Sequence, residues 1–170
     1  MILASRNPHK LTEVRQILGR TDIELAPADL PEPVEDAPTF EGNALIKARQ
    51  VAAATGRPAI ADDSGLIVDI MGAAPGIFSA RWSGRHGDDE ANLALLLAQL
   101  SDVPDDQRTA RFVCAAVLVT PEGEEIAVEG VMTGRILREP AGTGGFGYDP
   151  IFAADGYDVS TAELLSLIHI

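Results

Sequence analysis

The stretch Pro58-Ala59-Ile60-Ala61-Asp62-Asp63-Ser64-Gly65-Leu66 decides the fold, because an apolar run ends there in two adjacent carboxylates. We predict a short buried strand from Ala59 to Ala61 and a turn at Ser64-Gly65. In open α/β sheets, ligands bind in the loops at the carboxyl ends of strands. The pair Asp62-Asp63 is therefore the first candidate for a functional site.

Successive residues of a strand point to opposite faces, so Asp62 and Asp63 are expected to divide their roles. One acid would hold a metal ion and its neighbour would also reach a water molecule. Carboxylate oxygens are the hard ligands that Mg²⁺ prefers, and the sequence therefore favours a magnesium site here. The alternative is a pair of solvated turn acids.

Composition narrows the class of protein. The chain has 170 residues, of which 46% are hydrophobic and 23% charged, as expected for one globular domain with a real core. Its net charge of −13 disfavours nucleic acid and anionic membranes as partners, and a polyanionic ligand would need a divalent cation. Cys114 is the only cysteine, and we expect a buried core thiol in a reducing cytoplasm. We find neither a leader sequence nor an apolar run of membrane length.

The N-terminal segment predicts a strand over Met1–Ala4 and a helix that Asn7 caps and Pro8 begins. Lys10 then falls in the first helical turn, where the helix dipole disfavours cations. A lysine in that place is explained if an anion binds beside it, although an ordinary surface lysine remains the alternative.

Hydrophobic periodicity predicts the remaining elements. They are a strand at 23–26, an extended proline-rich loop at 27–38, a helix at 40–55, a strand at 66–70, a helix at 88–100, and paired strands at 109–119 and 125–137. The strand at 109–119 is apolar on both faces, which predicts a central place in the sheet.

A glycine-rich loop covers residues 141–150. Its glycines match the dinucleotide-binding spacing, but we reject that interpretation because Pro150 blocks a following helix. Such a loop allows the backbone to approach a ligand, with Phe146 stacking on a ring and Asp149 accepting from ring N–H groups. A plain connecting loop is the alternative.

Together these segments resemble the inosine triphosphate (non-canonical purine NTP) pyrophosphatases. The matching motifs run in order from Ile2 to about Leu164, and their collinearity is far more specific than any one motif. They are Ser5-x-Asn7-x-x-Lys10, Thr39-Phe40-x-x-Asn43-Ala44 with Lys47-Ala48, Ala61-Asp62-Asp63-Ser64-Gly65-Leu66, Ala74-Pro75-Gly76-Ile77-x-Ser79-Ala80-Arg81, Arg138-Glu139-Pro140, Gly144-Gly145-Phe146-Gly147-Tyr148-Asp149-Pro150 and Thr161-Ala162-Glu163-Leu164.

The resemblance implies a mixed α/β (α+β) fold, an elongated two-lobed domain whose central mixed sheet is flanked by helices, with a nucleotide cleft between the lobes. It also implies a cytoplasmic homodimer that uses Mg²⁺ to hydrolyse ITP, dITP and XTP to the monophosphate and pyrophosphate. The implied catalytic base and metal ligand is Asp63, with Asp62 beside it. The implied substrate-binding residues are Ser5, Arg6, Asn7, Pro8, His9, Lys10, Ser64, Phe146, Gly147, Tyr148 and Asp149. Backbone N–H groups of the glycine-rich loop would read the 6-keto group of the base.

The chain departs from the family pattern at two places. The family usually has a metal-binding acid immediately before the Asn of Thr-Phe-x-x-Asn, whereas this chain has Gly42 there and Glu41 one residue earlier. That shift rotates a helical side chain by about 100°, so both a metal-ligand role and a purely structural role stay open for Glu41. The family also continues into a Lys and a Ser-His-Arg segment. We therefore expect 1–170 to be a single domain that lacks this segment, with an exposed apolar stub after Leu164.

Two rival functions remain at this stage. A Mg²⁺-dependent phosphatase of the haloacid type would release phosphate, but its Asp-x-Asp signature is missing. A catalytically impaired nucleotide-binding protein is favoured by Gly42 and by the missing tail. The products formed from ITP would separate the three possibilities.

Overall fold

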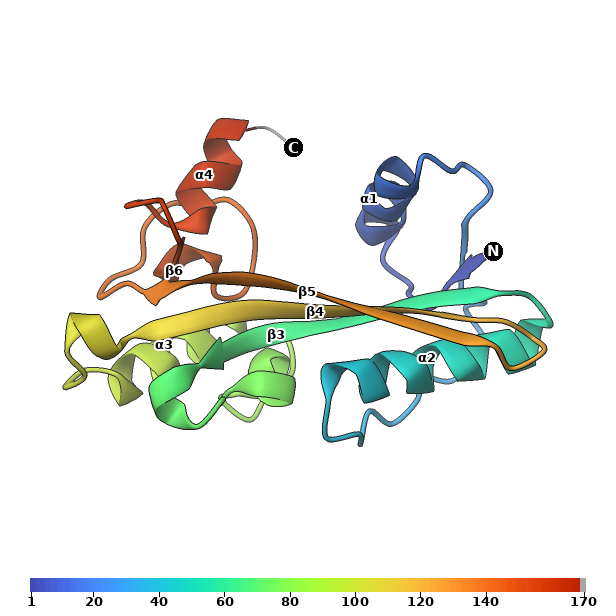
Figure 1. The fold of residues 1–170 in the computed structure, drawn as a ribbon, viewed down its shortest axis with the longest axis horizontal. Coiled ribbons are helices and arrows are strands. Elements are labelled where there is room, and N and C mark those ends of the chain that lie inside the picture. The colour runs from blue at the N-terminus through green and yellow to red at the C-terminus, as the bar shows by residue number, and fades with distance from the viewer. Residues whose placement is uncertain (169–170) are drawn as a thin grey trace. The chain divides into compact units, whose positions relative to one another are not determined.

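The computed structural model describes residues 1–168, and its six strands are hydrogen-bonded in the order β2-β1-β3-β4-β5-β6 (Figure 1). The strands are β1 (Ile2–Leu3), β2 (Glu24–Leu25), β3 (Ala59–Val68), β4 (Thr109–Val119), β5 (Glu125–Ile136) and β6 (Phe152–Ala154). The α-helices are α1 (Pro8–Leu18), α2 (Phe40–Thr55), α3 (Asp89–Gln99) and α4 (Thr161–Ile168). β1 is parallel to β2 and β3, whereas β5 and β6 are antiparallel, so the predicted mixed α/β class is confirmed.

The chain forms two compact units, which are described separately below. Unit 1 contains Met1–Ser64 and Cys114–Gly130, and unit 2 contains Gly65–Val113 and the residues from Val131 onward. Strands β3, β4 and β5 each contribute residues to both units. β4 is flanked by β3 and β5, which confirms the central place predicted from its apolar faces.

In unit 1, helix α2 packs its small residues against the strands. Ala44, Ala48 and Ala52 recur every four residues on one helical face and are fully or almost fully buried beside Ala59 and Val117. Thr39 caps the helix by accepting from the Gly42 N–H, and Gly56 ends it in the left-handed conformation with φ 63°. The bounds predicted from sequence are confirmed. Figure 1 shows α1 and α2 on opposite sides of the strands of this unit.

In unit 2, Leu96 of helix α3 and Leu100, which caps its C-terminus, belong to a core that includes Leu66 of β3 and Phe152 of β6. Asp88 caps this helix by accepting from the Ala91 N–H at 3.2 Å. A buried Arg108 completes the core. Its guanidinium donates to the backbone carbonyls of Leu100, Ile136 and Leu137, so its polar groups are satisfied without a carboxylate.

The predicted turn at Ser64-Gly65 is wrong, because β3 is one continuous strand from Ala59 to Val68. The predicted strand at 66–70 is its second half, and Asp69–Met71 form a short 3₁₀ helix instead. In the first half of β3 the buried side chains are at odd-numbered positions, Ala59 and Ala61. In the second half they are at even-numbered positions, Leu66 and Val68. The alternation of buried and outward-facing positions therefore changes between Ala61 and Leu66. Gly65 lies in this part of the strand, and a glycine inside a strand is typical of such an irregularity.

The predicted buried thiol is also wrong: Cys114 is exposed. It lies on β4 between the buried residues Val113 and Ala115, so its side chain points away from the core. Partial desolvation, followed by the charge of Asp62, raises the pKa of the thiol above its ordinary value, which keeps it protonated at neutral pH.

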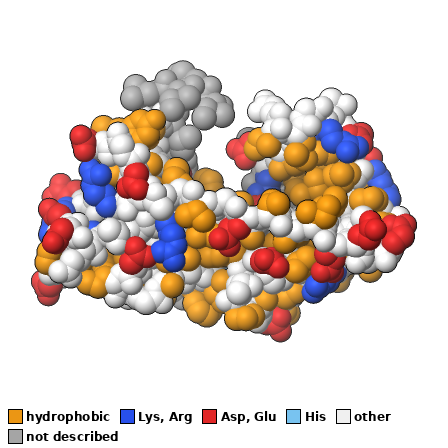
Figure 2. All heavy atoms as spheres, in the orientation of Figure 1, with side chains coloured by type: hydrophobic (Ala, Val, Ile, Leu, Met, Phe, Trp, Pro, Cys, Tyr) orange, Lys and Arg blue, Asp and Glu red, His pale blue; other side chains and the backbone are white. Residues whose placement is uncertain are grey.

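Acidic and hydrophobic side chains are interspersed on the face that Figure 2 shows. No helix among residues 1–168 is long and apolar enough to cross a membrane. The apolar stub predicted after Leu164 lies outside the part that the structure describes. This holds for the side chains of residues 165–168 and for the whole of His169 and Ile170.

Candidate active site

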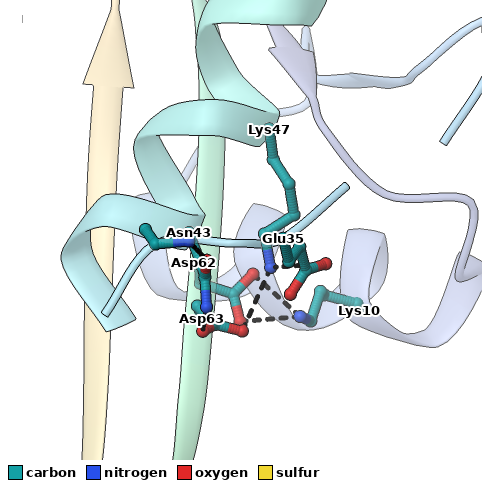
Figure 3. Close-up of polar contacts among 7 residues, drawn as sticks. Lys10, Glu35, Asn43, Lys47, Asp62 and Asp63 are labelled. Carbon is teal, nitrogen blue, oxygen red and sulfur yellow. Dashed lines mark hydrogen bonds and ion pairs between the residues drawn. The ribbon is translucent and has the colours of Figure 1, made fainter. Parts of the chain in front are cut away.

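Asp62 and Asp63 each contact a different helix of unit 1 (Figure 3). The Lys10 Nζ of α1 donates to both carboxylate oxygens of Asp62, at 2.8 and 2.6 Å. Asp63 instead contacts α2, with its Oδ1 3.2 Å from the Lys47 Nζ and its Oδ2 3.3 Å from the Asn43 Nδ2. The two side chains therefore point to different partners, as strand geometry predicts, while the division of metal and water roles between them stays a prediction.

The sheet explains how Lys10 reaches Asp62. β1 runs parallel to β3 with Leu3 opposite Ile60, so both strands lead toward the same edge of the sheet. Helix α1 starts five residues after Leu3, and Lys10 lies in its first turn. An ammonium group has three N–H donors, and Asp62 occupies two of them. Within the described residues no other partner of this ammonium group is recorded, so a third N–H would be available to an anion.

Asn43 and Lys47 are four residues apart on α2 and so share one face. Asn43 is only 1% exposed, and its Oδ1 accepts from the Ala37 N–H at 3.0 Å. This bond fixes the proline-rich loop beside the helix and brings Glu35 to 3.6 Å from the Lys47 Nζ. Glu35 is an acid near the candidate site that the sequence analysis did not single out. The only available signal was an acid in the loop immediately before the Thr-Phe-x-x-Asn motif.

Glu41 lies in the first turn of α2 and is exposed. Within residues 1–168 the structure records no bond between Glu41 and either aspartate, so its metal-ligand role remains a prediction. At the neighbouring position there is no room for a side chain, because a Cβ on Gly42 would come within 2.6 Å of the Ala37 Cβ. The loop that carries Glu35 thus occupies the space that an acid at 42 would need.

The other predicted phosphate-binding residues surround the start of α1. The Asn7 N–H donates to the Ser5 Oγ at 3.1 Å, and Pro8 is the first helical residue. Arg6 is exposed, donates to the Leu30 carbonyl and lies 3.6 Å from Glu32. The side chain of His9 lies outside the described part, and Ser64 is exposed on β3. This segment combines the cations Arg6 and Lys10 with the N-terminus of a helix, an arrangement that suits anions.

The glycine-rich loop in unit 2 presents one open aromatic ring. Phe146 is 81% exposed, in agreement with the predicted stacking surface. Tyr148 is buried instead, and its hydroxyl donates to the Ser79 carbonyl at 2.9 Å. Burial and the nearby Asp89 raise the pKa of that hydroxyl. Any contact of Tyr148 with a ligand would therefore involve its backbone.

Internal bonds already occupy several groups that the sequence analysis reserved for the base. The Asp149 Oδ2 accepts from the Phe146 N–H at 2.9 Å, and its Oδ1 accepts from the Thr161 hydroxyl at 2.9 Å. The Gly147 N–H donates to the Asp89 Oδ2 at 2.9 Å. In this arrangement, the N–H groups of Phe146 and Gly147 face protein carboxylates and not a ligand.

The carboxylates of Asp62 and Asp63 fit a magnesium ion only if substrate phosphates provide further ligands. No cluster of three or more acidic, histidine or cysteine side chains in residues 1–168 is arranged to hold a metal ion without other ligands. Mg²⁺, however, is commonly held by one or two carboxylates together with substrate phosphates. Asp62 and Asp63 would supply the carboxylates, and each is paired with a lysine ammonium group in this structure.

Comparison with known sequences gives consistent matches over almost the whole chain. Residues 1–166 match the Ham1 family. A dITP/XTP pyrophosphatase of Leifsonia xyli is 59% identical over 166 residues, which cover 96% of this chain and 83% of that protein. A dITP/XTP pyrophosphatase of Streptomyces coelicolor is 54% identical, with 96% of this chain and 85% of that protein covered.

Solved structures show the same fold. The nucleoside-triphosphatase / dITP/XTP pyrophosphatase of Mycobacterium abscessus superimposes with a TM-score of 0.84 at 55% identity, covering 95% of this chain and 87% of that one. A HAM1 protein from Coxiella burnetii gives a TM-score of 0.87 at 39% identity, covering 95% and 85%.

Proposed function

This chain belongs to the Ham1 family, and on that premise we propose that it hydrolyses the non-canonical purine nucleoside triphosphates ITP, dITP and XTP to the monophosphate and pyrophosphate. The observation that carries the proposal is the group of Asp62, Asp63, Lys10 and Lys47 at one place in unit 1. Removal of deaminated purines from the nucleotide pool would be its role.

In the proposed mechanism, Asp63 accepts a proton from the attacking water. Lys47 and Asn43 hold that carboxylate from opposite oxygens, which fixes its orientation before the substrate arrives. Lys10 donates to the phosphates with the N–H that Asp62 leaves free. Phosphoryl transfer depends chiefly on positioning and charge neutralisation, and these residues supply both.

We further propose that Mg²⁺ is required and that Asp62 and Asp63 hold it together with the substrate phosphates. When bound, the ion would neutralise charge on the triphosphate, which a chain of net charge −13 otherwise repels. Glu35 is our candidate for the third carboxylate, because it lies beside Lys47 whereas Glu41 contacts neither aspartate.

A panel of nucleotides tests the assignment of the base. With Mg²⁺ present, kcat/KM for ITP, dITP and XTP should exceed that for ATP by at least about a hundredfold, as expected when a polar site reads a hydrogen-bonding group. Equal hydrolysis of ATP and ITP would contradict it. Tight binding of ITP without products would favour the impaired nucleotide-binding protein.

Lys10→Ala should weaken phosphate binding without changing the choice of base. We expect KM for ITP and XTP to rise together by about tenfold, the loss typical of one charged hydrogen bond. Thermal stability should change little, because two effects of opposite sign are both small. Removal of a cation from the N-terminus of α1 relieves an unfavourable interaction with the helix dipole, and the lost ion pair with Asp62 is partly exposed to solvent. Steady-state kinetics with both nucleotides check this, and a loss confined to one nucleotide would refute the phosphate role.

We also propose that the protein is a cytoplasmic homodimer. The exposed Ile126 and Val128 on β5 of unit 1 support association, since neighbouring apolar side chains on a strand surface are typical of interfaces. Light scattering should give twice the mass of the 17.9 kDa chain. A monomer at all concentrations would contradict the proposal.

A further inference from the structure

The glycine-rich loop is held by a carboxylate that lies far from it in the sequence. Asp89 is the first residue of α3, and its Oδ2 accepts from the Gly147 N–H at 2.9 Å. The N–H of the preceding residue, Phe146, donates to the Asp149 Oδ2 within the loop itself. The adjacent N–H groups of Phe146 and Gly147 thus donate to two different carboxylates.

The loop needs such a restraint. Gly145 and Gly147 flank Phe146, and both have positive φ values, of 70° and 59°. Glycine at these positions leaves the backbone free to adopt other conformations, and a Cβ on Gly147 would meet no neighbouring atom within 4 Å. Packing around Gly147 therefore does not fix the loop that carries the Phe146 ring. The hydrogen bonds from the Phe146 and Gly147 N–H groups restrain it instead.

We propose that Asp89 is a positioning residue for base recognition: its carboxylate fixes the Gly147 N–H so that the ring of Phe146 is presented to the planar base of a purine nucleotide. The inference rests on the proposed function for the identity of the ligand, but the restraint on the loop does not. A carboxylate acceptor makes this a charge-assisted bond, which is stronger than a neutral one.

Three variants separate this role from a merely structural one. Asp89→Ala removes the acceptor. Asp89→Asn keeps an oxygen in the same place. Glu90→Ala is the matched control, because Glu90 is the other acid in the first turn of α3 and the structure records no bond from it within residues 1–168. Both alanine variants lose a similar interaction with the helix dipole.

For Asp89→Ala we expect KM for ITP to rise at least about tenfold while kcat stays within about threefold, because one charge-assisted hydrogen bond is lost at a distance from the reacting phosphates. Inhibition by inorganic triphosphate, which has no base, should not change. Asp89→Asn and Glu90→Ala should both remain within about threefold of the parent in KM, since each keeps the bond to Gly147.

Amide hydrogen exchange of residues 144–148 gives a readout that is independent of activity. It should accelerate in Asp89→Ala and not in Glu90→Ala. If the parent hydrolyses no purine nucleotide but this exchange pattern holds, the proposed function fails and the positioning role stands. If Asp89→Ala and Glu90→Ala behave alike in both KM and exchange, the inference is overturned. Asp89→Ser, too short to reach Gly147, replaces the alanine variant if that variant does not fold.

Discussion

Asp63→Asn should abolish hydrolysis of ITP while the fold is retained. The amide cannot accept the proton of the attacking water, and the negative charge beside Lys47 is lost. We expect kcat to fall at least about a hundredfold, the usual contribution of a general base. Folding should survive because the side chain keeps its shape and Lys47 still has Glu35 at 3.6 Å.

Single-turnover kinetics together with thermal unfolding check this prediction. A cooperative unfolding transition close to that of the parent shows that the loss of turnover is not a loss of structure. Turnover within about threefold of the parent would remove Asp63 from the role of base, since a general base contributes far more than that.

Glu35→Gln should have the second largest effect, and Glu41→Gln should have almost none. Glu35 and Asp63 both form an ion pair with Lys47, whereas Glu41 is exposed at the start of α2. We expect kcat/KM to fall at least about tenfold in Glu35→Gln, with more Mg²⁺ needed for half-maximal rate, because a charged group next to the site is lost.

The two glutamates form a matched pair, since both substitutions remove one charge from the same part of unit 1. Titration of the rate with Mg²⁺ in both variants decides between them. A strong magnesium defect in Glu41→Gln and none in Glu35→Gln would restore the assignment made from sequence and refute the one made from geometry.

The sequence predicted the elements whose local signals agree with their packing. Helix α2 is the clearest case, because the Thr39 cap, the alanines on one face and Gly56 all indicate the same bounds. Strand alternation also predicted that Asp62 and Asp63 would point in different directions, and the two side chains contact different helices.

The errors occurred where residues distant in the sequence decide the structure. Ser64-Gly65 is typical of a turn, but neighbouring strands keep β3 continuous through it. Glu35 has no periodicity to identify it, and its place depends on the bond between Ala37 and Asn43. Contact of Asp149 with the base stays a prediction, and the structure adds that its two oxygens accept from the Phe146 N–H and the Thr161 hydroxyl, which the sequence pattern does not show.

The identity of the phosphorus-containing product tests the central claim most directly. ITP is incubated with the protein and Mg²⁺, and pyrophosphate, phosphate, IMP and IDP are all quantified. The proposed mechanism predicts equal amounts of IMP and pyrophosphate, with no phosphate, and the loss of both products in Asp63→Asn. Release of phosphate with IDP as the main nucleotide product would contradict it.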